Sequence, residues 1–101
     1  MKAIAVLFTA VTLTAAAGLA QARDVSPQEI IQLHQAGTLK SFDELNQAAQ
    51  ALHPEASITE TDLEEHAGRY IYQVELRNAQ GVEWDVELDA VSGEVIKNKQ
   101  D

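Results

Sequence analysis

The sequence predicts an α+β fold in which an N-terminal helix pair packs on one face of a three-stranded antiparallel sheet, or a four-stranded one if Ile58–Glu64 joins it. Two runs, Tyr70–Arg77 and Val82–Asp89, alternate apolar and polar residues. Such alternation indicates strands with one side on a core and the other in water. Two helix-start signals, at Ser26 and Ser41, precede these runs. We therefore expect the helices to cover the apolar face of the sheet.

The helix boundaries follow from capping residues. The first helix is expected over Pro27–Ala36, with Ser26 as its N-cap and Gly37 after its last turn. The second is expected over Phe42–Leu52, with Ser41 as its N-cap. Spacings of three and four residues give this second helix an amphipathic stripe, which makes it the better candidate for packing on the sheet. The stripe consists of Phe42, Leu45, Ala49 and Leu52.

The remaining strands are weaker predictions. Ile58–Glu64 alternates, but Ile58 lies on the wrong side of a strict pattern, which a bulge or an edge position would accommodate. The two strong strands need an odd number of loop residues between them, so Asn78–Gly81 is expected in a three- or five-residue loop with a left-handed glycine. After a turn at Ala90–Gly93, Glu94–Lys97 is predicted as a short last strand.

The first 22 residues have the features of a cleaved export signal. Lys2 supplies a positive start, Ala3–Leu19 carries no charge, and Ala20-Gln21-Ala22 fits a small-x-small cleavage site. A membrane anchor is the rival interpretation, but Ala, Thr and Gly dilute the apolar run. The chain contains no Cys, so neither a lipid anchor nor a disulfide is expected. We predict an exported protein whose mature chain begins at Arg23 and has no membrane segment.

Charge limits the classes of partner. The formal net charge is −9, and it becomes −10 with the loss of Lys2, the one charged residue of the predicted signal. A protein this acidic is repelled by nucleic acids and by anionic membrane surfaces. Cationic proteins, basic peptides and metal ions remain as partners.

No arrangement in the sequence indicates catalysis. Ser26 and Ser41 are better explained as helix caps than as nucleophiles. The three histidines, His34, His53 and His66, lack the i, i+4 spacing of a helical metal pair. We therefore predict a protein that is not an enzyme and has no cofactor and no dedicated metal centre.

The polar side of the strong strands is the most conspicuous chemical feature. Glu83, Asp85, Glu87 and Asp89 alternate along one strand, and their spacing of about 7 Å is too wide for two neighbours to share one ion unaided. This row is interpreted first as a solvated face, then as a docking surface for a basic partner, and last as a metal site. The candidate partner-binding residues are Glu83, Asp85, Glu87, Gln73 and Glu75. Trp84 shares a side with Val86 and is expected in the core, with an exposed partner anchor as the alternative.

The order of these motifs resembles a PepSY domain. The resemblance rests on the Phe42–Leu52 helix, the Tyr72-Gln73-Val74-Glu75-Leu76 run, the Gly81–Asp89 strand and the Asp-Ala-x-x-Gly-x-Val end motif that starts at Asp89. It implies a helix packed on an antiparallel sheet and a non-catalytic, peptidase-regulating function. Similar proteins are small periplasmic proteins, and related domains occur in propeptides of thermolysin-type peptidases. No catalytic residue is carried over, and the matched Asp89 and Gly93 are better explained by turn geometry.

The predicted signal and the resemblance together divide the chain into three parts. These are a cleaved signal (1–22), an extra N-terminal helix and loop (23–40) and a PepSY-like α+β domain (41–99). The predicted function is that of a periplasmic, non-catalytic binding module that modulates another envelope protein, with a peptidase as the favoured target for inhibition or regulation. The alternative is an envelope cation-binding or stress-responsive accessory protein that uses carboxylates and His66.

Overall fold

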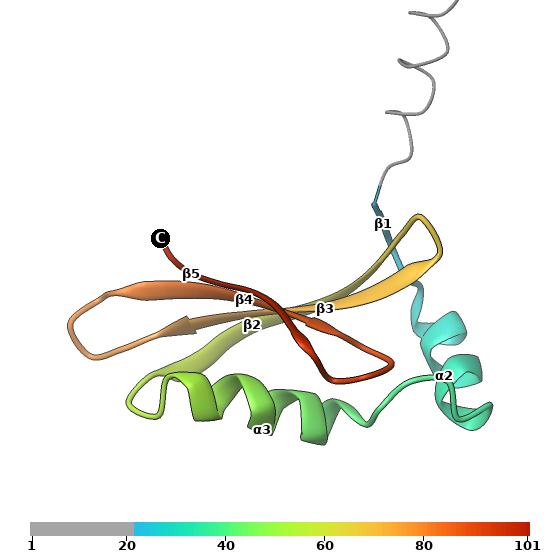
Figure 1. Ribbon diagram of the computed structural model, residues 1–101, viewed down its shortest axis with the longest axis horizontal. Helices are drawn as coiled ribbons and strands as arrows, with labels where there is room; N and C mark the ends of the chain where they lie inside the picture. Colours follow the sequence, from blue (N-terminus) through green and yellow to red (C-terminus); the bar gives the residue numbers. More distant parts are fainter. Residues whose placement is uncertain (1–21) are drawn as a thin grey trace, which may run out of the picture.

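The computed structural model describes residues 22–101, so the predicted export signal lies outside the described residues except for its last position. Two helices and five strands make up this part of the chain, and the strands form one antiparallel sheet in the order β1-β2-β3-β4-β5 (Figure 1). Within it, no helix is long and apolar enough to cross a membrane. The elements are β1 (Arg23–Asp24), α2 (Pro27–Gln35), α3 (Phe42–Leu52), β2 (Ser57–His66), β3 (Arg69–Arg77), β4 (Glu83–Asp89) and β5 (Val95–Gln100).

The α+β class is confirmed, but the prediction of three or four strands is wrong. The additional strand, β1, pairs through Arg23 with Glu65 and through Asp24 with Glu64. The next residue, Val25, donates its N–H to the Leu63 carbonyl at 3.0 Å. Two residues are too short for an alternating pattern, so β1 gives no periodic signal in the sequence. It forms because β2 offers an edge beside the entry to α2.

The two helices pack differently on the sheet. Figure 1 shows α3 lying along one face of the sheet, whereas α2 stands beyond the end of α3. Leu45 and Ala49 of α3 are buried, but no residue of α2 is fully buried. The predicted packing of a helix pair on one face therefore holds for α3, and α2 adds Ile30 and Leu33, which are partly buried against the edge of the core.

Both predicted N-caps are confirmed. The Ser26 hydroxyl accepts a hydrogen bond from the Glu29 N–H at 3.2 Å, and the Ser41 hydroxyl accepts one from the Glu44 N–H at 3.1 Å. Each cap satisfies one of the N–H groups that have no partner within the first turn of a helix. Gly37 follows α2 with a φ of +74°, a left-handed conformation that glycine adopts without a steric penalty.

The core lies between α3 and the central strands. Tyr72 is buried in the same layer, where its ring stacks on Phe42 with centroids 4.9 Å apart and its hydroxyl donates to Asn46 Oδ1 at 2.7 Å. A buried phenol therefore has a hydrogen-bond partner, as burial of a polar group requires. The largest fully buried side chains are Leu45, Leu76, Leu88, Val74 and Val86.

Local irregularities set the register of the strands. The pairing of β2 with β3 shifts between Ile58 and Glu60, so Thr59 is an extra residue and Ile58 lies opposite Leu76. This is a bulge, the first of the two explanations that the sequence left open for Ile58. The β3–β4 loop has five residues (78–82) with Gly81 at a φ of +83°, which confirms the loop prediction. The last strand is longer than expected and forms an edge at which every residue is exposed.

Candidate functional site

All five predicted site residues lie on the side of the sheet that faces away from α3, which we call the outer face. Successive strand residues point to opposite sides. Because Val74, Leu76 and Val86 are buried toward α3, the residues between them point outward. Cross-strand pairing sets Gln73 opposite Glu87, Glu75 opposite Asp85 and Arg77 opposite Glu83. The register therefore brings the predicted residues together on two adjacent strands.

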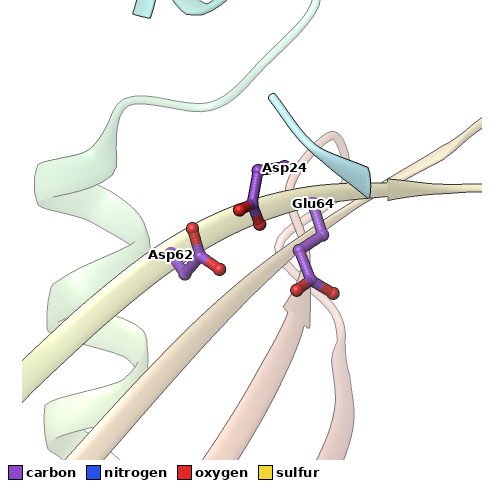
Figure 2. A group of neighbouring side chains, drawn as sticks. All are labelled: Asp24, Asp62 and Glu64. Carbon is purple, nitrogen blue, oxygen red and sulfur yellow. The ribbon is translucent and has the colours of Figure 1, made fainter. Parts of the chain in front are cut away.

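The outer face is also lined by acidic residues that the sequence reasoning did not single out. Glu60 of β2 is paired with Glu75, and Asp62 with Gln73, so β2 extends the carboxylate surface by one strand. Asp24 of β1, Asp62 and Glu64 form what we call the acidic triad, in which one carboxylate oxygen of each residue lies within 4.8 Å of the others. Figure 2 shows these three side chains gathered where β1 meets β2. The alternation of Glu60, Asp62 and Glu64 was a usable signal, but Asp24 had none.

Two members of the triad, Asp62 and Glu64, have a raised pKa. Burial raises the pKa of Asp62 first, and the nearby charge of Asp24 raises it further. Burial likewise raises the pKa of Glu64, followed by the charges of Asp62 and Asp24. Among the described residues, none of these three carboxylates is in an ion pair with Lys or Arg. The triad therefore concentrates negative charge, and a bound cation would reduce the repulsion among its carboxylates.

Cations neutralise most of the β4 row instead. Arg77 pairs with Glu83, with Nε donating to Oε2 at 3.0 Å. Glu87 Oε2 lies 4.0 Å from Lys97 Nζ and accepts a hydrogen bond from Gln73 Nε2 at 3.3 Å. Exposed pairs of this kind contribute little stability, but they occupy the carboxylates that take part in them.

Asp85 differs from its neighbours on β4. No ion pair holds it among the described residues, and its pKa is raised by burial and then by a hydrogen bond with Asp101 and by the charge of that residue. Asp101 also has a carboxylate oxygen within 4.8 Å of those of Glu75 and Glu83. The far end of the outer face therefore holds a second group of close carboxylates.

Asp89 serves the β4–β5 turn. Its Oδ1 accepts the N–H groups of Val91 and Ser92 at 2.8 and 3.0 Å, and its Oδ2 accepts from Arg69 Nε at 3.1 Å. Hydrogen bonds from the backbone N–H groups, chiefly that of Ser92, hold the pKa of Asp89 below its usual range, and Arg69 adds to the effect. Gly93 completes the turn with a φ of +83°. The interpretation of Asp89 and Gly93 as turn residues is confirmed.

A hollow of about 220 Å³ lies in the middle of the outer face. Four of the five predicted site residues line it, and Glu83 does not. Its lining is mainly carboxylate and amide, with one ammonium group at Lys97, so it suits a basic or strongly hydrogen-bonding group better than an apolar one. The polar residues that line it are Glu60, Thr61, Asp62, Gln73, Glu75, Asp85, Glu87 and Lys97.

Hard cations are the inorganic ligands that such oxygens prefer. The acidic triad offers one oxygen from each of three residues, whereas calcium takes six to eight oxygens, so water or further protein oxygens would have to complete its shell. His66 lies at the exposed end of β2 and belongs to neither group of close carboxylates. The described residues therefore do not form the alternative site in which His66 and carboxylates would bind one ion together.

Comparison with known proteins finds a family match for most of the described chain. A model of the family described as "Peptidase propeptide and YPEB domain" (PepSY) matches residues 40–99. The chain is also similar to the uncharacterized protein YkoJ of Bacillus subtilis (strain 168), with 40% identity over 45 residues. That stretch covers 45% of this chain and 26% of YkoJ, so the chain matches about a quarter of the length of that relative. No solved structure was found to match the chain.

Proposed function

The chain belongs to the PepSY family, and from that premise we propose that it is a non-catalytic binding module that docks its outer face on a basic surface of another envelope protein. The family description, which refers to peptidase propeptides, favours a peptidase as the partner to be inhibited or regulated. One observation carries the proposal. Carboxylates on the outer face are left without a cation among residues 22–101, most closely in the acidic triad.

The mechanism is electrostatic docking. An acidic face steers a basic partner during encounter, and the hollow gives one Lys or Arg side chain of that partner a polar seat. Glu75 and Asp85 are directly opposite each other in that hollow, with Gln73 and Glu87 beside them. Because no reacting group is involved, the module acts by occupying a surface of its target. The predicted signal at residues 1–22 would deliver it to the periplasm, where a peptidase partner would be met.

Recovery of a partner from an envelope extract tests the proposal. The bait with Asp62→Asn and Glu64→Gln should bind the partner up to about thirtyfold more weakly than the wild-type bait at low salt, because two exposed ion pairs contribute up to about 1 kcal/mol each. A second bait with Asp85→Lys and Glu87→Lys reverses charge inside the hollow and should lose more. The matched control carries Asp43→Asn and Glu44→Gln, which remove the same charge from α3 on the other side of the sheet.

Mass spectrometry of the recovered protein then tests the partner class. A basic peptidase retained by the wild-type and control baits, and lost from the two outer-face variants, is the expected result. Equal recovery by all four baits would contradict docking through the outer face. Recovery of a protein of another class would retain the docking surface and remove the peptidase.

The acidic triad favours cation binding as the second candidate function. Its three oxygens are close enough to bind one ion, and a bound cation would relieve the repulsion among them. Calorimetric titration with calcium, copper and zinc should then give heat that Asp62→Asn abolishes, and the melting temperature should rise with the metal. Absence of both heat and a melting shift at millimolar metal would remove this candidate.

A further inference from the structure

A second hollow lies on the α3 side of the sheet, where the end of α3 meets the β3–β4 hairpin. Its volume is about 230 Å³, below the roughly 300 Å³ at which pockets for drug-sized ligands begin. Its lining includes Leu52, Pro54, Ala56 and Trp84, together with the carboxylate of Glu55. We call it the tryptophan groove. Its size and its mainly apolar walls suit one side chain of a partner better than a free small molecule.

Trp84 is held in place as one wall of this groove. It is only partly buried, although its register predicted a core position. The imidazole of His53 stacks on the indole, with ring centroids 4.6 Å apart and planes 22° apart. The same imidazole is tied to β5, because its Nε2 lies 2.7 Å from Asn98 Oδ1. The indole is thus positioned before any partner arrives, which lowers the cost of ordering it on binding.

The charge around the groove selects a cation. Glu55 is exposed and is in no ion pair among the described residues. The last turn of α3 carries no basic residue, so the only side-chain donor that the described residues place there is the neutral Gln50 amide, which donates to the His53 carbonyl at 3.0 Å, and the partial negative charge at this end keeps no cationic partner within the last turn. A cationic group in the groove would meet a carboxylate, a helix C-terminus and the face or edge of an indole together.

We propose that the tryptophan groove binds an arginine side chain of a partner protein. The aliphatic stem would pack on Leu52 and Pro54, and the guanidinium would lie against Trp84 and pair with Glu55. Arginine fits better than lysine because its planar, weakly hydrated guanidinium both stacks on an aromatic ring and hydrogen-bonds a carboxylate. The groove is on the other side of the sheet from the acidic triad, so this site is independent of docking through the outer face.

Trp84 provides a local probe, because it is the only Trp and gives a single indole N–H resonance. The isotope-labelled protein is titrated with acetyl-Gly-Arg-Gly-amide and with the lysine counterpart at constant ionic strength. The arginine peptide should shift the indole resonance and bind about fivefold more tightly than the lysine peptide, as expected for stacking on an indole. No indole shift, or equal affinity for the two peptides, would overturn the proposal.

Two variants locate the bound peptide. Glu55→Gln removes an exposed charge without disturbing packing, and it should weaken the arginine peptide about threefold, as loss of one exposed ion pair does. Glu60→Gln removes one charge from the outer face and should leave the affinity unchanged. Equal losses of affinity for both variants would show that the peptide is attracted by the overall negative charge of the protein. That result would overturn the proposed arginine site in the tryptophan groove. Equal recovery of the envelope partner by all four baits, together with arginine-peptide binding that Glu55→Gln weakens, would contradict the proposed function alone.

Discussion

The two sides of the outer face both carry carboxylates, but Lys and Arg neutralise more of them on one side than on the other. On the β1–β2 side, Asp24, Asp62 and Glu64 face one another without a cation among the described residues. On the β4 side, Glu83 is paired with Arg77 and Asp89 with Arg69. The number of carboxylates along a strand therefore does not show which of them are available to a partner.

Strand register produces this difference. Cross-strand neighbours decide the local balance of charge in a sheet, and opposite charges stabilise where like charges do not. Arg77 of β3 faces Glu83, and Lys97 of β5 faces Glu87, so β4 receives cations from both sides. The outward carboxylates of β2, Glu60, Asp62 and Glu64, face Glu75, Gln73 and Ile71, none of which is a cation. Most carboxylates of the conspicuous acidic row on β4 have a Lys or Arg partner. The carboxylates of the less conspicuous row on β2 have none among the described residues.

Among substitutions on the two sides of the outer face, the largest change in the free energy of unfolding is expected at Asp89. Asp89→Ala removes the acceptor of two backbone N–H groups in the β4–β5 turn, and it should lower the free energy of unfolding by about 1–2 kcal/mol, as loss of a helix cap does. The measurement is urea unfolding at neutral pH. Asp89→Asn retains Oδ1 and loses the charge beside Arg69, so it should restore part of the loss.

The sign of the pKa shift fixes how this loss depends on pH. Because the pKa of Asp89 is lowered by folding, its ionised form adds stability above its usual pKa, and that stability is lost as pH falls through the lowered value. The gap between wild type and the Asn variant should therefore narrow in acid. A gap that widens as pH falls would contradict the assignment of Asp89 as a stabilising turn acceptor.

Much of this architecture could be predicted from the sequence because it depends on local chemistry. The two Ser caps, the left-handed Gly81 and the alternation of β3 and β4 follow from residue type and spacing, and the structure confirms them. The misplaced Ile58 indicated either a bulge or an edge position, and the structure has the bulge, because a one-residue slip moves every later side chain to the other face.

The features that were not predicted depend on contacts between residues far apart in the sequence. The periodicity of a single segment gives no information on such contacts. The two residues of β1 form a strand only because the edge of β2 is beside them, so the predicted strand count was wrong. The register of β4 with Val86 predicted a core position for Trp84, but α3 ends at Leu52 and leaves the ring partly exposed beside His53. The acidic triad joins residues 38 positions or more apart along the chain, from Asp24 to Asp62 and Glu64.

The smaller and opposite effect is expected at Asp62. Asp62→Asn should raise the free energy of unfolding at neutral pH by roughly 0.2–0.5 kcal/mol, the size of one exposed charge interaction. The reason is that burial and the charge of Asp24 make the ionised form of Asp62 unfavourable in the folded chain. The same urea unfolding measurement applies, so the two Asp→Asn variants, Asp62→Asn and Asp89→Asn, are expected to change stability in opposite directions.

The pH dependence at Asp62 is also the reverse of that at Asp89. Its folded pKa is raised, so between its usual value of about 4 and that raised value the folded chain binds more protons than the unfolded chain. Wild-type stability therefore falls as pH rises through this window, and the advantage of Asp62→Asn should grow over the same window and vanish in stronger acid. If Asp62→Asn is less stable than wild type at neutral pH, or if its advantage does not change with pH, then the triad is neutralised by an interaction other than those described. The contrast between the two sides of the outer face would then fail.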